Sequence, residues 1–310
     1  MSKLLQSSFK QITNTKLLDI LFIELPIWFP LIYIYLAINF QSISKFIFIG
    51  SLFLFAETHF ASTWLFFFDK ENKTWIKENF YRVVFLPIYT FLLIIFTWFF
   101  SPTLIIVAHY LASGWHVTKQ STGILKIYLN NTRKYEFMIY LISFLCIFIG
   151  LQRPGLLSDL FDKTAVNLTL GFSFLCYLII LFLNYKKILP TRIYNFMPVF
   201  TGLTIYLPIL FFKDLATATA VGVGMHWCQY ISIMWSSFLR KNKISKNPKF
   251  TSKLFLKRIL FVFGYSFVMT SFVVMGSSKS SDGIIEYSFI YLIPLTFQLY
   301  HFYIDGFIWK

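Results

Sequence analysis

The chain ends in the stretch Gln298-Leu-Tyr-His-Phe-Tyr-Ile-Asp-Gly-Phe-Ile-Trp-Lys310, which closes an apolar run long enough to cross a bilayer. This run carries His301 and Asp305 one helical turn apart, so a helix places both side chains on one face. Ionisable groups are costly inside a membrane, and they usually face the protein interior and serve a function. The alternative is a polar helix end whose side chains reach the headgroup water. We expect a spanning helix that contributes His301 and Asp305 to a buried site.

The composition predicts an integral membrane protein. Of the 310 residues, 57% are hydrophobic and only 13% are charged, whereas a soluble domain carries about twice that charged fraction. The net charge of +15 does not indicate a nucleic-acid partner, because the basic residues lie in short connectors between apolar runs. We expect the protein in the inner (plasma) membrane of a bacterium, surrounded by lipid. The sequence leaves the oligomeric state open.

The apolar runs predict an all-α transmembrane bundle of about ten spans, which forms one domain over residues 1–310. Residues 1–16 are polar and basic. The first run is longer than a signal-peptide core, so we expect it to be retained as a span. The predicted spans are 18–40, 46–68, 80–100, 102–125, 137–151, 167–184, 193–212, 217–239, 254–275 and 283–308.

The basic residues predict the orientation of these spans. Connectors after even-numbered runs are rich in lysine and arginine, as at Lys70, Lys73 and Lys77, whereas connectors after odd-numbered runs are poor in them. Cytoplasmic loops carry the excess of positive charge. The alternation therefore places both termini in the cytoplasm.

All five histidines fall inside predicted spans, namely the second, fourth, eighth and tenth, which share one direction. We expect His59, His116, His226 and His301 to converge in a pocket between the middle and the inner side of the membrane. His109 precedes His116 by seven residues, or about 10 Å along a helix. That is too far for one ion, so His109 would support the site, bind a second metal or line a pathway.

Other polar residues accompany the histidines. Glu57, Tyr230 and Asp305 are the candidate catalytic residues, since such groups orient metal-bound imidazoles or shuttle protons. A histidine-rich set suits iron, copper or zinc, and spacing alone does not choose between these metals. The alternative for each histidine is a simple hydrogen bond between helices.

Four short stretches together resemble motifs of the Brp/Blh family. They are Ile23-Glu-Leu-Pro26, Thr58-His-Phe60, Met225-His-Trp-Cys-Gln-Tyr230 and Ile304-Asp-Gly-Phe-Ile-Trp-Lys310. That family comprises polytopic microbial membrane enzymes that cleave beta-carotene to retinal with a histidine-held iron and dioxygen. Where the family has an LPHG-type motif, this chain has Leu25-Pro-Ile-Trp28, and where the family has a His-x-x-x-His pair, it has His226 and Tyr230. The resemblance implies a shared scaffold whose metal site is rebuilt with His116 and His301.

These observations favour an intramembrane histidine-ligated metalloenzyme. We expect an iron-dependent oxygenase that acts on a hydrophobic small molecule, such as a lipid or a carotenoid-like isoprenoid. Three alternatives remain open: a b-type haem electron-transfer protein, a proton- or cation-coupled transporter, and a structural membrane protein. The chain has no GxSxG, HExxH, Walker or dinucleotide-binding motif, and its three cysteines lie in apolar runs without a CxxC pair.

Overall fold

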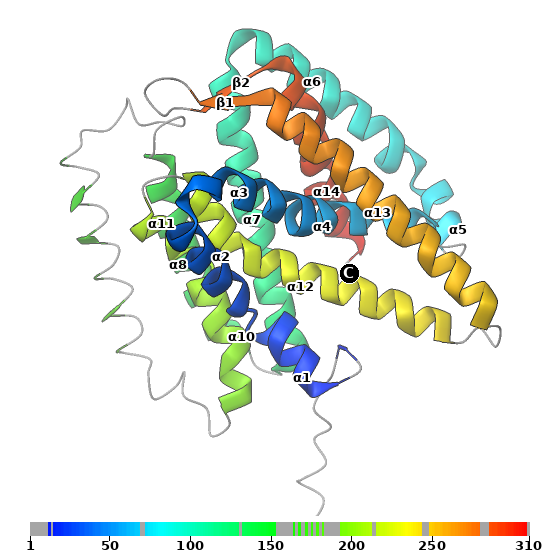
Figure 1. Cartoon of the computed structure of the whole chain (residues 1–310), viewed down its shortest axis with the longest axis horizontal. Coiled ribbons are helices and arrows are strands. Elements are labelled where there is room, and N and C mark those ends of the chain that lie inside the picture. Colours follow the sequence, from blue (N-terminus) through cyan, green and yellow to red (C-terminus); the bar gives the residue numbers. More distant parts are fainter. Residues whose placement is uncertain are drawn as a thin grey trace, which may run out of the picture.

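The computed structural model describes residues 12–13, 15–68, 72–129, 132–152, 193–212, 215–243, 248–279 and 285–308, with isolated positions between 164 and 182. The chain folds into a bundle of helices (Figure 1). The helices before residue 152 are α1 Lys16–Asp19, α2 Trp28–Asn39, α3 Ser44–Ser51, α4 Glu57–Trp64, α5 Asn72–Glu78, α6 Leu86–Phe100, α7 Pro102–Tyr128 and α8 Arg133–Leu151. The later helices are α10 Ile193–Thr204, α11 Pro208–Phe211, α12 Leu215–Lys243, α13 Pro248–Gly276 and α14 Leu292–Ile308.

Single π-helical turns join several of these helices into longer rods. They cover Ile20–Glu24, Leu52–Ala56 and Tyr81–Phe85, and so extend α1, link α3 to α4 and precede α6. The first predicted span differs from a single straight helix. The rod Lys16–Glu24 and α2 meet at a bend of 58°. Pro26 lies at this bend, and proline cannot donate the backbone hydrogen bond that would continue the helix.

The boundary between the third and fourth predicted spans lies where the sequence places it. α6 ends at Phe100, and α7 begins at Pro102. The Ser101 side chain caps α7 by accepting a hydrogen bond from the Leu104 backbone N–H at 3.3 Å. A serine cap followed by proline at the first helical position is a strong start signal, so two helices can follow each other without a loop.

The last predicted span is shorter than the sequence suggested. Residues before α14 form a small antiparallel hairpin in which β1 Ser277–Lys279 pairs with β2 Ile285–Tyr287. α14 then starts at Leu292 rather than near residue 283. A Cβ at Gly276 would collide with the Tyr291 backbone, so glycine permits the close approach of this hairpin to the start of α14. Among the described residues this corner is the exception in a chain that is otherwise helical, as the predicted all-α class requires.

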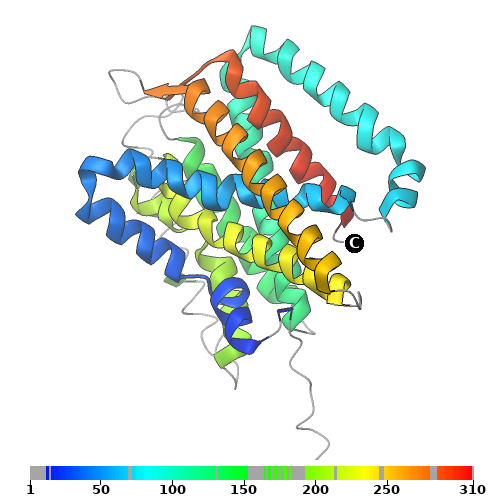
Figure 2. The same cartoon turned by 45° about the vertical axis from the view of Figure 1, so that its right-hand side comes forward.

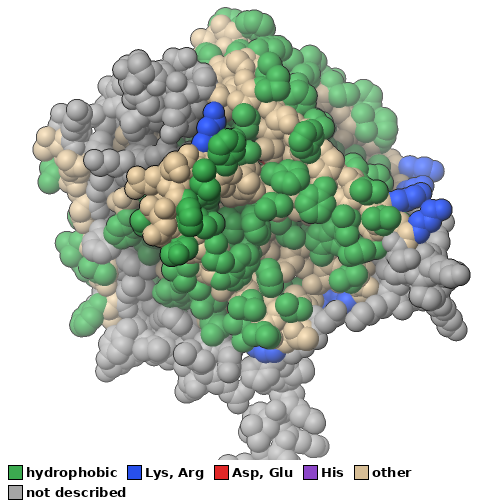
Figure 3. All heavy atoms as spheres, viewed as in Figure 1, with side chains coloured by type: hydrophobic (Ala, Val, Ile, Leu, Met, Phe, Trp, Pro, Cys, Tyr) green, Lys and Arg blue, Asp and Glu red, His purple; other side chains and the backbone are tan. Residues whose placement is uncertain are grey.

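The outer surface is apolar, as a membrane protein requires. Within the described residues, four helical segments are long and apolar enough to cross a membrane, namely Gln41–Phe68, Tyr81–Phe100, Arg133–Leu151 and Lys253–Gly276. The bent pair Lys16–Glu24 and α2 gives a fifth if it counts as one span. Figure 3 shows hydrophobic side chains covering most of the described part of one face, with lysine and arginine at its edges. The sixth predicted span, 167–184, lies outside the described residues apart from isolated positions. The ten-span arrangement and the cytoplasmic termini stay predictions.

Helix α12 lies at the centre of the packing. It contacts α2, α4, α7 and α11, while α13 and α14 pack together and α6 covers α14 from outside (Figure 2). Two glycines allow this density, because a Cβ at Gly222 would collide with the Ile205 carbonyl oxygen and one at Gly224 with the Phe29 ring. Small residues permit such close approach between membrane helices.

Candidate metal centre

Four helices that meet in the middle of the bundle each contribute one histidine. His59 lies on α4, His116 on α7, His226 on α12 and His301 on α14, and the contacts between α4 and α12, α7 and α14, α4 and α14, and α7 and α12 bring them together (Figure 1). All four side chains are buried, with exposed fractions between 0% and 7%. The four residues that the sequence pointed to as ligands therefore form one cluster.

The distances within this cluster suit hydrogen bonds between imidazoles and are also compatible with a shared metal ion. Nε2 of His226 lies 3.2 Å from Nε2 of His59, and Nε2 of His301 lies 3.3 Å from Nε2 of His116. His59, His116 and His301 each offer a ligand atom within 4.8 Å of the others. Two nitrogens about 2.1 Å from one ion are about 3.0 Å apart at a right angle and about 3.4 Å apart at the tetrahedral angle. The buried group His59, His116 and His301 could therefore hold a metal ion.

All four helices carry a polar side chain four residues after the histidine, which on α7 is Gln120. On the other three helices this side chain joins one hydrogen-bonded layer. The pairs are His59 and Thr63 on α4, His226 and Tyr230 on α12, and His301 and Asp305 on α14. Residues four apart lie on the same helical face, one turn along the axis. A polar layer made of Thr63, Tyr230 and Asp305 thus lies one turn beyond the histidines.

Hydrogen bonds connect this polar layer to the cluster. The Tyr230 hydroxyl donates to Oδ1 of Asp305 at 2.7 Å and lies 2.5 Å from Oγ1 of Thr63. Oγ1 of Thr63 lies 2.6 Å from Nδ1 of His301. Because Nδ1 of His301 is hydrogen-bonded to Thr63, the other ring nitrogen, Nε2, is the one that faces His116. The layer thereby fixes the orientation of the His301 ring, as hydrogen bonds to the second ring nitrogen of a histidine do in metal proteins.

Asp305 faces two histidines at once. Its Oδ2 lies 3.7 Å from Nε2 of His116 and 3.7 Å from Nε2 of His301, and the side chain is only 4% exposed. A carboxylate at this distance adds negative charge beside a cation held by neutral imidazoles. Asp305 is therefore placed to orient ligands or, after a small shift, to join them.

Hydrogen bonds of Thr58 hold the segment that carries His59 against the preceding turn and against α13. This segment follows the π-helical turn Leu52–Ala56, and the Thr58 hydroxyl donates to the Phe53 carbonyl at 2.9 Å. The same hydroxyl lies 3.1 Å from Oγ of Ser266 on α13. Single π-helical turns often occur near functional sites, where they redirect the side chains that follow.

Glu57 and His109 lie apart from the four clustered histidines. Glu57 accepts a hydrogen bond from the Gln298 amide at 3.1 Å, so its hydrogen-bond partner is an amide of α14 and not the neighbouring imidazole of His59. The physical reason is the helical period, because residues two positions apart point to nearly opposite faces. The His109 ring packs 5.8 Å from the Phe302 ring, which lies between it and the His116 ring at 4.8 Å.

Thr63 is the residue that the sequence interpretation missed. Threonine is common on membrane helices and is weak evidence of function when taken alone. The available signal was the spacing: the four-residue step from His59 to Thr63 matches the step from His226 to Tyr230 and from His301 to Asp305.

A pocket of about 690 Å³ opens beside the cluster. His116 and Asp305 line it together with apolar and aromatic side chains of α7 and α14, among them Trp115, Leu299 and Phe302. Ligand pockets are typically of this size and largely apolar with a few placed polar groups. The histidine cluster is therefore buried and yet borders a space large enough for a lipid-like molecule.

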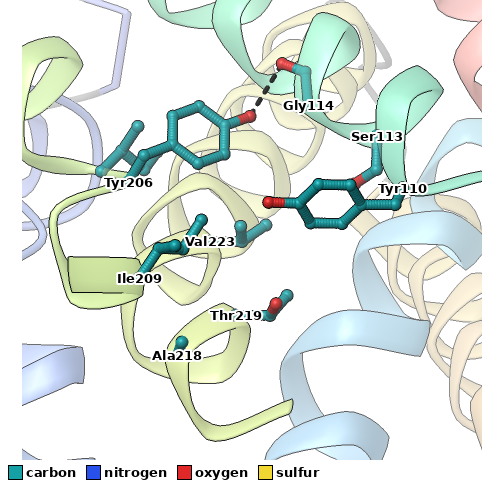
Figure 4. A pocket seen from close by; sticks show the side chains of 9 residues that line it. Tyr110, Ser113, Gly114, Tyr206, Ile209, Ala218, Thr219 and Val223 are labelled. Carbon is teal, nitrogen blue, oxygen red and sulfur yellow. Dashed lines mark hydrogen bonds between the residues drawn. The ribbon is translucent and has the colours of Figure 1, made fainter. Parts of the chain in front are cut away.

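A second cavity, of about 30 Å³, lies beside the part of α7 that precedes His116 (Figure 4). It is lined by residues of α7, α11 and α12, and the Tyr206 hydroxyl donates to the Gly114 carbonyl oxygen at 2.8 Å. Figure 4 shows the Tyr206 ring directed toward this carbonyl. The cavity is too small for a substrate, so its walls serve to position α7.

Comparisons of the chain with protein-family models, with curated proteins and with solved structures find no match.

Proposed function

We propose that this chain is an intramembrane metalloenzyme, an iron-dependent oxygenase that acts on a lipid or isoprenoid substrate. The observation that carries the proposal is the convergence of four buried histidines from four separate helices, three of them with ligand atoms within 4.8 Å of one another. Burying several imidazoles in a membrane interior is costly unless they share a partner. A metal ion is the partner that their spacing suits.

The choice of iron rests on the donor set and on the short motifs. Imidazole ligands with a nearby carboxylate suit non-haem iron, and zinc or copper are the competitors. The stretches that resemble the Brp/Blh family also converge in space: His59, His226 and Asp305 come from three of them. The fourth is tied to α12, because the Gln229 amide donates to the Ile23 carbonyl at 2.8 Å.

A bound non-haem iron would supply dioxygen activation at this site. The chain supplies the remaining functions. The histidines hold the ion, Thr63 and Tyr230 fix the orientation of His301 and Asp305, and the surrounding helices exclude water. His116 and Asp305 border the pocket, so a hydrophobic substrate that enters from the bilayer reaches the ion from this side.

The spacing of the rings disfavours the b-type haem alternative. The ring centroids of His59 lie 4.5 Å from His301, 4.8 Å from His226 and 6.2 Å from His116. His116 in turn lies 4.8 Å from His301 and 5.1 Å from His226. A planar macrocycle between any of these pairs would collide with the remaining rings. The absorption spectrum of the purified protein tests this, because a haem protein would show a Soret band.

Isotope-labelled dioxygen tests the proposed reaction. Protein purified in detergent, loaded anaerobically with ferrous iron and mixed with a bacterial isoprenoid and lipid extract should transfer labelled oxygen into a product detected by mass spectrometry. A His116→Ala variant should form none, while His109→Ala should retain activity. Equal labelling with and without iron would overturn the oxygenase proposal.

A further inference from the structure

The pocket beside the histidine cluster is a groove that follows helix α7, and the kind of residue that lines it changes along the helix. Its α7 residues run from Ala112 to Ile127, with His116 between the two ends. At about 1.5 Å per residue the groove follows this helix for roughly 20 Å. Such a shape fits an elongated molecule rather than a compact one.

One part of the groove is apolar. Ala112 of α7 lies on the N-terminal side of His116, and Leu299 and Phe302 of α14 also line the groove. An acyl or isoprenoid chain would be accommodated here by contacts with these side chains, which bury its surface as the bilayer does.

The other end of the groove carries two lysines among polar and apolar residues such as Gln120, Ile124 and Ile127. Lys119 and Lys126 line it on the C-terminal side of His116, and the second of them lies about 15 Å from His116 along the helix. Lys126 forms an ion pair with Glu136 at 3.0 Å, while Nζ of Lys119 lies 5.5 Å from the centroid of the Trp115 ring. Of the two ammonium groups, Lys119 is therefore the better placed to accept a negatively charged group.

We propose that this groove binds a single-chain amphiphile with an anionic head, the carboxylate of a fatty or isoprenoid acid or the phosphate of a prenyl lipid. The head lies at Lys119, and the apolar chain passes His116 and Asp305 into the apolar part. The order of the lining residues places a carbon near the head, not the far end of the chain, beside the histidine cluster. The position of the reacting carbon rests on the proposed function, whereas binding of the amphiphile does not.

The charged side chains that line the groove favour an anionic ligand over a neutral one. Asp305 is the one acidic residue among the described residues that line the groove, and it lies at the level of His116 rather than at the end that carries the lysines. A neutral alcohol or hydrocarbon would gain nothing from Lys119. A carboxylate or phosphate would gain a charge-assisted contact with the exposed Lys119 ammonium group.

Photo-crosslinking tests this binding directly. Protein in nanodiscs of zwitterionic phosphatidylcholine is exposed to three probes that carry the same diazirine-bearing chain and differ only in the head: a carboxylate, a phosphate and an alcohol. The ionised probes should label peptides from 112–127 of α7 and 299–306 of α14 up to roughly fivefold more than the alcohol does. The stronger of the two ionised probes identifies the kind of head.

Three variants make the result specific. Lys119→Gln should lower labelling by the ionised probes roughly fivefold and leave the alcohol unchanged, and Lys119→Arg should restore it. Lys134→Gln is the matched control, because Lys134 is also exposed and also makes a cation–π contact, with Tyr135, but does not line the groove. Equal labelling by acid and alcohol, or equal effects of Lys119→Gln and Lys134→Gln, would overturn the proposal.

Photo-crosslinking tests the groove proposal and metal content tests the metalloenzyme proposal, so either proposal can be refuted without the other. Crosslinking needs no metal, so a protein that labels in this pattern but binds no metal would sustain the groove and refute the metalloenzyme. A protein that binds iron but shows no preference for the ionised probes would refute the groove proposal alone.

Discussion

Oγ1 of Thr63 lies 2.6 Å from Nδ1 of His301, although 238 positions separate the two residues in the chain. The same hydroxyl lies 2.5 Å from the Tyr230 hydroxyl, which in turn donates to Asp305. One threonine therefore links α4, α12 and α14 at the level directly beyond the histidines.

Thr63→Val should weaken metal binding while leaving the fold intact. Valine keeps the shape of threonine but cannot hydrogen-bond, so His301 loses the contact that orients its ring. Loss of such a supporting hydrogen bond typically lowers metal affinity by about 10- to 100-fold. Competition with a calibrated chelator measures the change.

Thr118→Val is the control for this substitution. Thr118 is equally buried on a histidine-bearing helix, but its hydroxyl donates to the Gly114 carbonyl of its own helix at 2.8 Å. Metal affinity should remain within about twofold of the unmodified protein. If both variants lose affinity equally, the Thr63 contact has no special role.

Tyr230→Phe should change the electronic environment of the metal more than the stability of the protein. The substitution removes the hydroxyl that donates to Asp305, at a cost of about 1 kcal/mol to folding. The visible absorption bands of the cobalt-substituted protein should shift, because Asp305 moves relative to His116 and His301.

Tyr206→Phe removes a comparable buried hydrogen bond that does not involve Asp305, the one to the Gly114 carbonyl. It should lower the stability by a similar amount and shift the cobalt spectrum less than Tyr230→Phe does, because Asp305 keeps its hydrogen-bond donor. Identical spectra for the two tyrosine variants would contradict the assigned role of Tyr230.

His116→Ala and His109→Ala form a matched pair on α7. The first removes a ligand from the cluster and should abolish stoichiometric metal binding, whereas the second removes a ring that packs against Phe302 and should retain it. Elemental analysis of both purified variants distinguishes them. A loss of metal in His109→Ala would place a metal two turns from the site described here.

Gly222→Ala should destabilise the bundle. Its Cβ would collide with the backbone carbonyl of Ile205, which cannot move aside as a flexible side chain would, and overpacking of this kind costs about 1–3 kcal/mol. Gly264→Ala, where no atom lies within 4 Å of the new Cβ, should be neutral or stabilising by up to about 1 kcal/mol. Thermal unfolding in detergent compares the two, and equal melting temperatures would contradict the packing of α11 against α12.

Much of the helical architecture could be predicted from the sequence, because hydrophobic runs of span length have few alternatives in a membrane. The Ser101-Pro102 boundary was predictable for the same kind of local reason, a capping residue followed by proline. The bend at Pro26 and the hairpin before α14 were not foreseen. Their local signals are Glu24 and Pro26 at the bend, and the polar run Ser277-Ser-Lys279 and Glu286 at the hairpin. A hydropathy window of span length averages over such short interruptions.

The candidate site was predictable in its members but not in its geometry. Histidine is rare enough that its placement in four spans indicated a cluster. Which nitrogen of each ring faces the centre depends on contacts between helices far apart in the chain, such as that between Thr63 and His301. Glu57 shows the opposite case, since its nearness to His59 in sequence favoured a shared role while the helical period directs it to Gln298.

The metal content of the purified protein tests the central claim most directly. After anaerobic reconstitution with ferrous iron and removal of excess metal, the chain should retain about one equivalent of iron, and the His59→Ala, His116→Ala and His301→Ala variants should each retain almost none. Less than about half an equivalent of any transition metal in the unmodified protein, with the fold intact, would contradict a metal centre in the histidine cluster.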